Sequence, residues 1–497
     1  MAKILQINPG DDVAVAMDLL SPGQQIGDLT IHEMIQAGHK VALHDIAVGE
    51  PVKKYGYSIG VARLPIKAGS WVHTHNLESN INGRLEGLRF YPRISVEKSA
   101  TSNPPVFQGF RRPDGRAAVR NEIWIINTVG CVNRASEQIA TAANQQLVEL
   151  GVEGVYAFPH PFGCSQLGDD LEYTQKILAG LVNHPNAGAV LLLGLGCENN
   201  QMRLMLDHLG PQDSQRIRYF NAQEVGDEVQ LGLKHIHELS EYARTFKRRA
   251  VSVSELILGA KCGGSDGFSG ITANPLVGKV ADRLVDFGGT VLLSEVPEMF
   301  GAEQVLLQRA TDEAVFNNTL DMVNNFRDYF RRYNQPIDEN PSPGNIQGGI
   351  TTLAEKSLGC VQKGGHSPIR QVVSYGNAAR PRLGALALVE SPGNDGVSST
   401  AMTVAGAHIL LFTTGRGTPM GFPVPTIKIS SNSALAQRKG QWIDFDAGRL
   451  SNENADPKSL ADELFNLVLK VASGETHTRN EINGCREIAI WKNGVTL

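Results

Sequence analysis

Short apolar runs without helical spacing dominate the first part of the chain, residues 1–95. The runs at 39–46, 51–63 and 70–76 are short, with turns at Gly49, Gly56 and Gly69. This pattern predicts a small barrel or β-clip built from several short strands. Residues 96–108 are polar at first and contain two consecutive prolines, a composition that is typical of a linker.

From residue 109 the pattern changes to an alternation of apolar runs and amphipathic stretches. The runs at 121–129, 154–160 and 189–196 are each followed by residues in which apolar positions recur at helical spacing. The run at 189–196 has no polar alternation, as expected for a strand covered on both faces. Residues 109–247 are therefore predicted to form an α/β domain with a mostly parallel sheet.

A basic, hydrophilic segment at 243–255 indicates a second boundary, and another α/β series fills residues 252–497. Its predicted strands are 256–260, 290–296, 384–390 and 408–415. The turn-rich segment 334–349 is long, and loops of this length in compact domains are usually functional or disordered. The predicted fold class is α/β, with a small N-terminal β domain followed by two α/β domains with mostly parallel sheets.

Composition narrows the classes of function. The 497 residues are 41% hydrophobic and 20% charged, and the formal net charge is −5. We expect no nucleic-acid partner, because the longest basic run is only residues 247–249. No apolar stretch has the length of a signal peptide or a membrane span, so we expect a cytoplasmic protein without a membrane partner. Six cysteines are too few for a disulfide framework in so long a chain.

Four of those cysteines follow predicted strands, each beside a glycine: Cys131, Cys164, Cys197 and Cys262. Ligands of parallel α/β sheets bind at the carboxyl ends of the strands. Other polar residues at these ends are His160, Glu198, Glu295, Glu298, Asp395 and Arg416. Two interpretations are open: the thiols belong to a metal site, or they are small buried groups that fit crowded turns. The spacing is not that of a zinc finger.

The sequence "WVHTHN" adds His73 and His75, which would project to one face if both lay on a strand. Such a pair is a reasonable metal ligand set, although an exposed polar strand face is the commoner outcome for this spacing.

The sequence disfavours nucleotide binding. The segment "GFSGITANPLVGKV" lacks the spacing of a phosphate-binding P-loop, and "GLGCEN" has only two glycines of a dinucleotide fingerprint.

Long blocks of the sequence match one known family. They include "VHTHN", "FGCSQLGDD", "GLGCENNQ", "CGGSDGFSGITANP", "SEVPEMFGAEQ", "NPSPGNIQGGITTLAEKSLGC" and "REIAIWKNGVTL". The chain resembles the altronate and galactarate dehydratases over its whole length, and the first three blocks fit the altronate branch. The resemblance implies a SAF or β-clip domain at the N-terminus. It also implies a hydro-lyase that converts D-altronate to 2-dehydro-3-deoxy-D-gluconate in hexuronate catabolism, with iron(II), or alternatively manganese(II), as cofactor.

Dehydration of a 2,3-dihydroxy acid requires a base for the C2 proton, an acid for the departing 3-hydroxyl and stabilisation of the intermediate charge. The predicted metal ligands are His73, His75, Cys131, Cys164 and Cys197. The predicted acid–base or second ligand groups are His39, His160, Glu295 and Glu298. The predicted substrate-binding groups are Gly263, Gly264, Ser265, Asp266, Lys363 and Arg416.

Several alternatives stay open. The cysteines could instead hold an iron–sulfur centre. The substrate could be galactarate or sulfolactate, and a non-enzymatic interpretation is a regulator that binds sugar acids. In each case the partner is a small sugar acid, and we expect a homo-oligomer.

Overall fold

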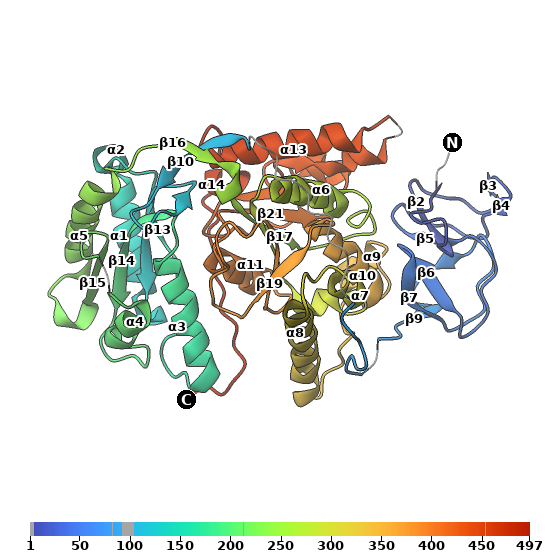
Figure 1. The fold of residues 1–497 in the computed structure, drawn as a ribbon, viewed down its shortest axis with the longest axis horizontal. Helices are drawn as coiled ribbons and strands as arrows, with labels where there is room; N and C mark the ends of the chain where they lie inside the picture. Colours follow the sequence, from blue (N-terminus) through green and yellow to red (C-terminus); the bar gives the residue numbers. More distant parts are fainter. Residues whose placement is uncertain (1–3, 82, 92–103, 212, 453) are drawn as a thin grey trace.

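Three sheet-containing domains lie in a row in the computed structural model, which describes residues 4–81, 83–91, 104–211, 213–452 and 454–497. We call them the N-terminal domain (residues 4–81), the second domain (residues 106–252) and the C-terminal domain (residues 253–497). The C-terminal domain lies between the other two (Figure 1). Most of the predicted linker at 96–108 falls outside the described residues.

The N-terminal domain consists of short antiparallel strands, as predicted. A four-stranded sheet has the order β1-β2-β5-β8, a three-stranded sheet has the order β6-β7-β9, and β3 pairs with β4. The strands are β1 (Ile4–Leu5), β2 (Val13–Ala16), β3 (Gln25–Ile26), β4 (Leu29–Thr30), β5 (Lys40–Ala42), β6 (Pro51–Lys54), β7 (Tyr57–Ala62), β8 (Trp71–Val72) and β9 (Leu77–Glu78).

The strand that was expected to carry both His73 and His75 is too short to do so. β8 ends at Val72, and residues 73–76 form a turn in which Asn76 N donates to His73 O at 3.0 Å. The Asn76 side chain closes the turn by accepting from His73 N at 2.9 Å. The prediction that the two histidines share a strand face is therefore wrong, because Asn76 turns the chain.

The second domain has the predicted parallel sheet, in the order β13-β12-β14-β15. Its elements are β12 (Glu122–Asn127), α1 (Asn133–Asn144), α2 (Leu147–Leu150), β13 (Val155–Ala157), α3 (Gly168–Val182), β14 (Ala187–Gly194), α4 (Met202–Leu209), β15 (Ile217–Asn221) and α5 (Glu228–Ala243). Every residue of β12 and β14 is buried, because helices cover both faces of the sheet.

The expected boundary at 243–255 contains a strand, β16, that pairs with the first strand of the second domain. β16 (Arg249–Ser252) pairs with β10 (Val106–Arg111), which also pairs with β11 (Ala117–Ala118). Arg248 binds the same region through Gln108 O at 2.6 Å and Val119 O at 3.0 Å. Arg248 also pairs with Glu153 at 2.6 Å, so this basic side chain links the strand to the rest of the second domain.

The C-terminal domain is built on a seven-stranded parallel sheet in the order β19-β20-β18-β17-β21-β22-β23. The strands are β17 (Ile257–Cys262), β18 (Thr290–Leu293), β19 (Ile369–Val373), β20 (Ala385–Val389), β21 (Ile409–Thr414), β22 (Thr426–Ser430) and β23 (Phe445–Asp446). The helices are α6 (Ala273–Asp286), α7 (Glu303–Leu307), α8 (Glu313–Arg332), α9 (Pro343–Gln347), α10 (Leu353–Cys360), α11 (Asp395–Val404), α12 (Ser433–Arg438), α13 (Pro457–Ala472) and α14 (Arg479–Ile482). No helix among the described residues is long and apolar enough to cross a membrane.

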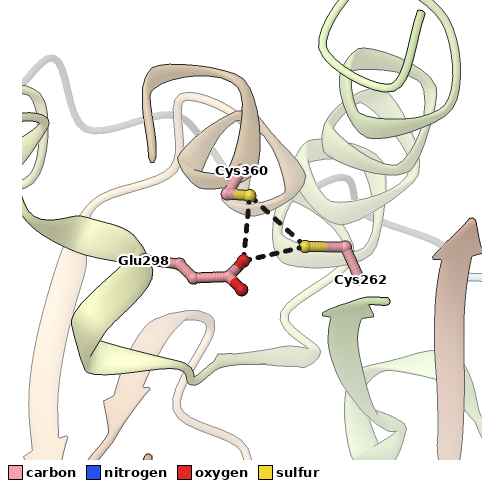
Figure 2. A group of neighbouring side chains, drawn as sticks. All are labelled: Cys262, Glu298 and Cys360. Atoms are coloured by element: carbon pink, nitrogen blue, oxygen red, sulfur yellow. Dashed lines mark hydrogen bonds between the residues drawn. The ribbon is translucent and has the colours of Figure 1, made fainter. Parts of the chain in front are cut away.

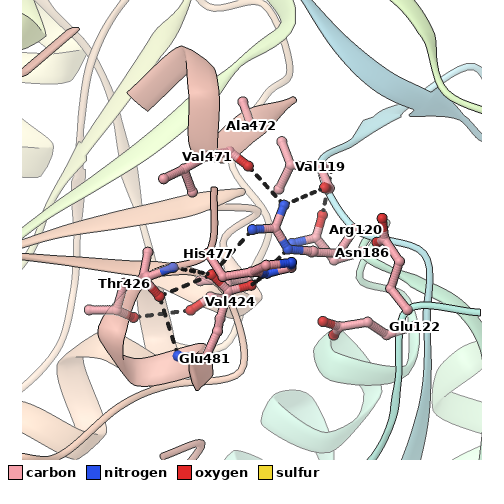
Figure 3. Close-up of polar contacts among 12 residues, drawn as sticks. Val119, Arg120, Glu122, Asn186, Val424, Thr426, Val471, Ala472, His477 and Glu481 are labelled. Atoms are coloured by element: carbon pink, nitrogen blue, oxygen red, sulfur yellow. Dashed lines mark hydrogen bonds and ion pairs between the residues drawn. The ribbon is translucent and has the colours of Figure 1, made fainter. Parts of the chain in front are cut away.

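Buried ion pairs join the second and C-terminal domains. Arg120 pairs with Glu481 at 2.7 Å and donates to the carbonyl oxygens of Val119 and Val471 (Figure 3). Arg486 pairs with Glu122 at 2.9 Å. These charges are compensated within the interface, which is the condition for burying them without a large loss of stability.

His408 lies in the same interface, and its burial predicts a pH effect on stability. Burial lowers the pKa of His408 to about 4, with the nearby Arg116 also lowering it and Glu255 raising it. The unfolded chain takes up this proton near the ordinary pKa of 6.5. The favourable contribution is therefore complete above that value and is lost as the pH falls toward 4. At about pH 5 the loss is about 2 kcal/mol in the free energy of unfolding.

The test is the pH dependence of urea unfolding for the His408→Asn variant. Asparagine retains an acceptor for the Ile257 N–H, which His408 Nδ1 accepts at 3.0 Å, but it does not titrate. We expect the loss between about pH 8 and about pH 5 to be about 2 kcal/mol smaller in the variant than in the unmodified protein. An identical pH dependence for the two proteins would contradict this assignment.

Candidate active site

Three segments of the C-terminal domain bring two thiols and a carboxylate together. Cys262 ends β17, Glu298 lies on the single turn 296–299 after β18, and Cys360 ends α10. Glu298 Oε2 is 3.3 Å from Cys262 Sγ and 3.1 Å from Cys360 Sγ, and the two sulfur atoms are 3.3 Å apart (Figure 2). All three side chains are buried.

This donor set fits a metal ion. Among the described residues, Cys262, Glu298 and Cys360 form the group of at least three potential ligands whose donor atoms all lie within 4.8 Å of one another. Ligands about 2.0–2.3 Å from a common ion are separated by distances close to those seen here. Two soft thiolates with one carboxylate suit iron(II) or zinc better than magnesium or calcium.

Three buried lysines surround the centre and balance its negative charges. Lys363 Nζ donates to Cys262 Sγ at 2.7 Å and pairs with Glu295 Oε2 at 2.9 Å. Lys261 bridges Glu295 and Asp395. Lys356 pairs with Glu298 at 2.9 Å. Each carboxylate at the centre therefore has a lysine partner.

The charged partners keep these groups ionised despite their burial. Burial acts to raise the pKa of Glu298, but Lys356, Lys261 and Lys363 hold that pKa well below its usual range. Burial acts to lower the pKa of Lys363, yet Cys262 and Glu295 raise it well above its usual range. A hydrogen bond to Cys262, followed by burial, raises the pKa of the Cys360 thiol. The centre thus combines the positive charges of buried lysines with the protonated thiol of Cys360. A bound metal cation would favour the thiolate form of that thiol.

Glu295 is held in an unusual backbone conformation. Its φ of 71° lies in the left-handed region, which costs a residue with a side chain about 1–3 kcal/mol. This conformation places the carboxylate between Lys261 and Lys363, both fully buried. Strain of this kind is retained where the surrounding structure requires it.

An open cavity of about 660 Å³ leads to the centre. Glu298, Lys356 and Asp395 line it, and the turn-rich segment 339–346 forms part of its wall, within the long loop that was predicted to be either functional or disordered. Gly263 also lines it, and a Cβ at this position would collide with Asp395, because it would lie 2.4 Å from Asp395 Oδ2. The cavity is large enough for a sugar acid and exposes both a cation and a carboxylate.

The remaining residues predicted to bind substrate do not all line this cavity. Gly264 lines the cavity, whereas Asp266 is buried and accepts hydrogen bonds from Ser269, Ser431 and Asn432. Ser265 is buried beside it, and Arg416 is exposed and donates to Gln347 at 2.8 Å. The Asp266 carboxylate thus holds a turn together and is not free to bind a substrate hydroxyl.

The N-terminal histidines contact the C-terminal domain beside the start of α10. His73 Nδ1 lies 3.0 Å from Thr351 Oγ1, and His39 Nε2 lies 3.3 Å from Gln347 O. His75 is exposed, with its ring 5.2 Å from that of Trp71. The structure does not bring these histidines into the group formed by Cys262, Glu298 and Cys360.

A buried charge cluster fixes the N-terminal domain at this contact. Glu355, on α10, pairs with Lys40 and with Lys54, each at 2.8 Å. Burial would raise the pKa of Glu355, but the two lysines lower it to about 2. Burial lowers the pKa of Lys40 to about 8 despite the neighbouring Glu355. The helix that carries Cys360 is therefore held by two lysines of the N-terminal domain.

The other predicted ligands lie on the second domain, on the opposite side of the C-terminal domain from the N-terminal histidines (Figure 1). Cys131, Cys164 and Cys197 are exposed. His160 is buried, and its ring nitrogens contact Asn127 O at 2.9 Å and Phe162 N at 3.2 Å. Within one chain, these groups do not join His73 and His75.

Sequence reasoning missed several members of the centre. Cys360 ends a helix, so a search of strand ends does not find it. Lys261 precedes Cys262 inside an otherwise apolar strand, and a charged residue in a buried strand was an available signal. Lys356 lies four residues before Cys360, one helical turn away, but its role depends on Glu298 from a distant segment.

The fold and the centre define an α/β enzyme with a buried thiol–carboxylate site beside a polar cavity. Family models match three successive parts of the chain. They are described as the altronate/galactarate dehydratase SAF domain (residues 2–80), the D-galactarate dehydratase/altronate hydrolase second domain (residues 109–244) and the D-galactarate/altronate dehydratase C-terminal domain (residues 253–496).

Full-length relatives give the same result. The chain is 47% identical to an altronate dehydratase of Escherichia coli and 43% identical to one of Bacillus subtilis, with 100% of each chain covered in both cases. It is 32% identical to the galactarate dehydratase (L-threo-forming) of Escherichia coli, over 96% of this chain and 94% of that one. The chain belongs to the D-galactarate/altronate dehydratase family and is a hydro-lyase.

Proposed function

We propose that this enzyme dehydrates D-altronate to 2-dehydro-3-deoxy-D-gluconate, and that the reaction takes place in the cavity beside Cys262, Glu298 and Cys360. The observation that carries the site assignment is that three buried donors converge and that one of them, Glu298, lines a cavity together with Lys356 and Asp395. Full-length identity to two altronate dehydratases, higher than to the galactarate enzyme, supports the choice of substrate.

We propose iron(II) as the metal and Cys262, Glu298 and Cys360 as the residues that would hold it. When bound, the metal supplies a Lewis acid that stabilises negative charge on the substrate as the C2 proton leaves. The thiols favour iron(II) over manganese(II), which prefers oxygen ligands. Glu295 does not need to be a ligand, because Lys261 and Lys363 already pair with it.

The cavity-lining residues have separate roles in this proposal. The Lys356 ammonium attracts the substrate carboxylate to the side of the cavity where Glu298 lies. Asp395 is partly exposed. It accepts the C2 proton and passes it to the 3-hydroxyl as the C3–O bond breaks, so that water leaves, while Lys261, 2.9 Å away, fixes its orientation. Lys363 and Glu295 touch no substrate. They are positioning residues that hold the Cys262 sulfur in place.

A comparison of substrates tests the function. Release of 2-keto acid is measured with D-altronate, galactarate and sulfolactate at equal concentration, under anaerobic conditions with iron(II). We expect D-altronate to have the highest kcat/KM, by about tenfold or more, because one missing or misplaced polar contact changes the barrier by over 1 kcal/mol. Faster turnover of either other substrate would replace the proposal with that substrate's lyase.

Removal of the metal tests the chemistry. Chelation followed by desalting is expected to lower kcat about a hundredfold or more, since the Lewis acid is lost. Adding iron(II) should restore activity better than adding manganese(II) or zinc. Metal content, measured by mass spectrometry of the digested protein, is compared with activity for each preparation. Full activity in protein shown to be metal-free would contradict the assignment.

A further inference from the structure

The second domain carries three exposed cysteines that the proposed reaction does not use. Cys131, Cys164 and Cys197 follow β12, β13 and β14, which are adjacent in the sheet with β12 in the middle. Cysteine is among the residues most often buried in proteins. Three exposed thiols at the carboxyl ends of three neighbouring parallel strands are therefore a feature that packing does not explain.

Hydrogen bonds hold the three cysteine loops against one another. Gly130 N donates to Phe162 O at 2.9 Å, which joins the loops of Cys131 and Cys164. Asn200 N donates to Gly163 O at 2.9 Å, which joins the loops of Cys164 and Cys197. Adjacent strands lie about 4.8 Å apart, so the ends of the three strands that lead into these loops span about 10 Å. We call this surface the cysteine rim.

The separation of the thiols distinguishes a cluster from a single ion. The three sulfur atoms do not all lie within 4.8 Å of one another, unlike the donor atoms of Cys262, Glu298 and Cys360. One ion bound by all three would require closer sulfur atoms. A cuboidal iron–sulfur cluster is bound by thiolates on different iron atoms and so accepts wider spacing.

The electrostatic surroundings of the rim favour an anionic group. Each loop leads into a helix, and the helices α1, α3 and α4 all begin without a side-chain cap. By contrast, α5 in the same domain is capped by Asp227. The positive ends of three helix dipoles therefore lie on the side of the sheet where the thiols lie, and they stabilise negative charge there.

Buried amide groups beside the rim also lack partners. Gln166 Nε2 and Asn200 Oδ1 have no hydrogen-bond partner among the described residues, and both side chains are at least nine-tenths buried. Gln166 is two residues from Cys164, and Asn200 is three residues from Cys197. Unpartnered buried polar atoms are uncommon in native proteins and often mark a missing ligand.

From these observations we infer that Cys131, Cys164 and Cys197 bind a [4Fe–4S] cluster through three thiolates, which leaves the fourth iron open to an oxygen ligand. This centre is separate from the buried one proposed for dehydration. Such a cluster should also lose one iron ion when it is oxidised. Mild oxidation with ferricyanide should release the unligated iron according to [4Fe–4S]²⁺ → [3Fe–4S]⁺ + Fe²⁺ + e⁻, with the electron taken by ferricyanide.

The test is anaerobic reconstitution of the full chain with ferrous iron and sulfide, followed by desalting. We expect a brown protein with broad visible absorbance and about four iron and four sulfide ions per cluster, beyond any iron at the buried centre. Ferricyanide should then produce the paramagnetic [3Fe–4S]⁺ signal. A colourless protein without acid-labile sulfide, or a protein that binds iron without sulfide, would overturn the inference.

Variants assign the cluster to the rim. Cys131→Ser, Cys164→Ser and Cys197→Ser should each lose at least half of the sulfide, whereas the matched control Cys485→Ser should retain all of it. Folding is checked by thermal unfolding, which exposed thiols should not affect. Cys360→Ser should lower dehydratase activity but keep the sulfide, so failure of the proposed function and failure of the cluster are distinguishable. Retention of sulfide in all three rim variants would overturn the inference.

Discussion

Replacing Glu298 with glutamine is expected to lower kcat/KM for D-altronate about a thousandfold, which corresponds to about 4 kcal/mol. Glutamine has nearly the same shape and can still accept from Lys356, but it removes the carboxylate that lies 3.3 Å from Cys262 Sγ and 3.1 Å from Cys360 Sγ. An amide is a weak metal ligand and gives no charge to the site. We therefore expect metal binding to fall together with activity.

The measurement is kcat/KM and iron content in the same preparation, and Glu339→Gln is the control. Glu339 lines the same cavity but is exposed and is not part of the thiol–carboxylate group. That variant should remain within about threefold of the unmodified enzyme, as expected for an exposed charge. If Glu298→Gln kept its iron and lost less than about tenfold in kcat/KM, the buried group would not be the active centre.

Replacing Glu355 with glutamine is expected to destabilise the docking of the N-terminal domain by about 3–5 kcal/mol. The change leaves the ammonium groups of Lys40 and Lys54 buried with no anion between them. Lys40 would lose its proton more readily than Lys54, since burial already lowers the pKa of Lys40 to about 8. Relative to the unmodified protein, amide hydrogen exchange in the variant should become faster in β5 and β6 but should not change in the sheet of the second domain.

A neutral triple variant separates charge from packing. Lys40→Met, Lys54→Met and Glu355→Leu together remove all three charges and keep apolar volume, and replacement of a buried ion network in this way is often neutral or stabilising. We expect the triple variant to recover most of the lost protection. Equal exchange rates in Glu355→Gln and the unmodified protein would show that the ion cluster does not fix the domain.

The sequence pattern was sufficient for the fold and for part of the centre. Apolar runs and helical spacing depend on neighbouring residues, so they predicted the parallel sheets of the second and C-terminal domains. The rule that ligands gather at strand ends led to Cys262, Glu295 and Glu298, because these follow β17 and β18. The same rule could not separate these residues from His160, whose ring nitrogens contact backbone groups.

The rest depends on contacts between distant segments. Cys360 reaches the centre from the end of α10, and nothing in its local sequence shows which strand the helix approaches. His73 was misplaced because a two-residue strand followed by a turn closed by Asn76 resembles a longer strand in sequence. The pairing of Glu355 with Lys40 and Lys54 joins residues more than 300 positions apart, and only domain packing determines it.

That pairing also gives the N-terminal domain a pattern of charges that the C-terminal domain can recognise. Contacts between the two domains include the ion pairs of Lys40 and Lys54 with Glu355, all buried, and neutral contacts such as that of His73 Nδ1 with Thr351 Oγ1. A covalent link only raises the local concentration of one partner near the other. A version of this domain that lacks either ammonium group would leave the Glu355 carboxylate only half compensated at the contact.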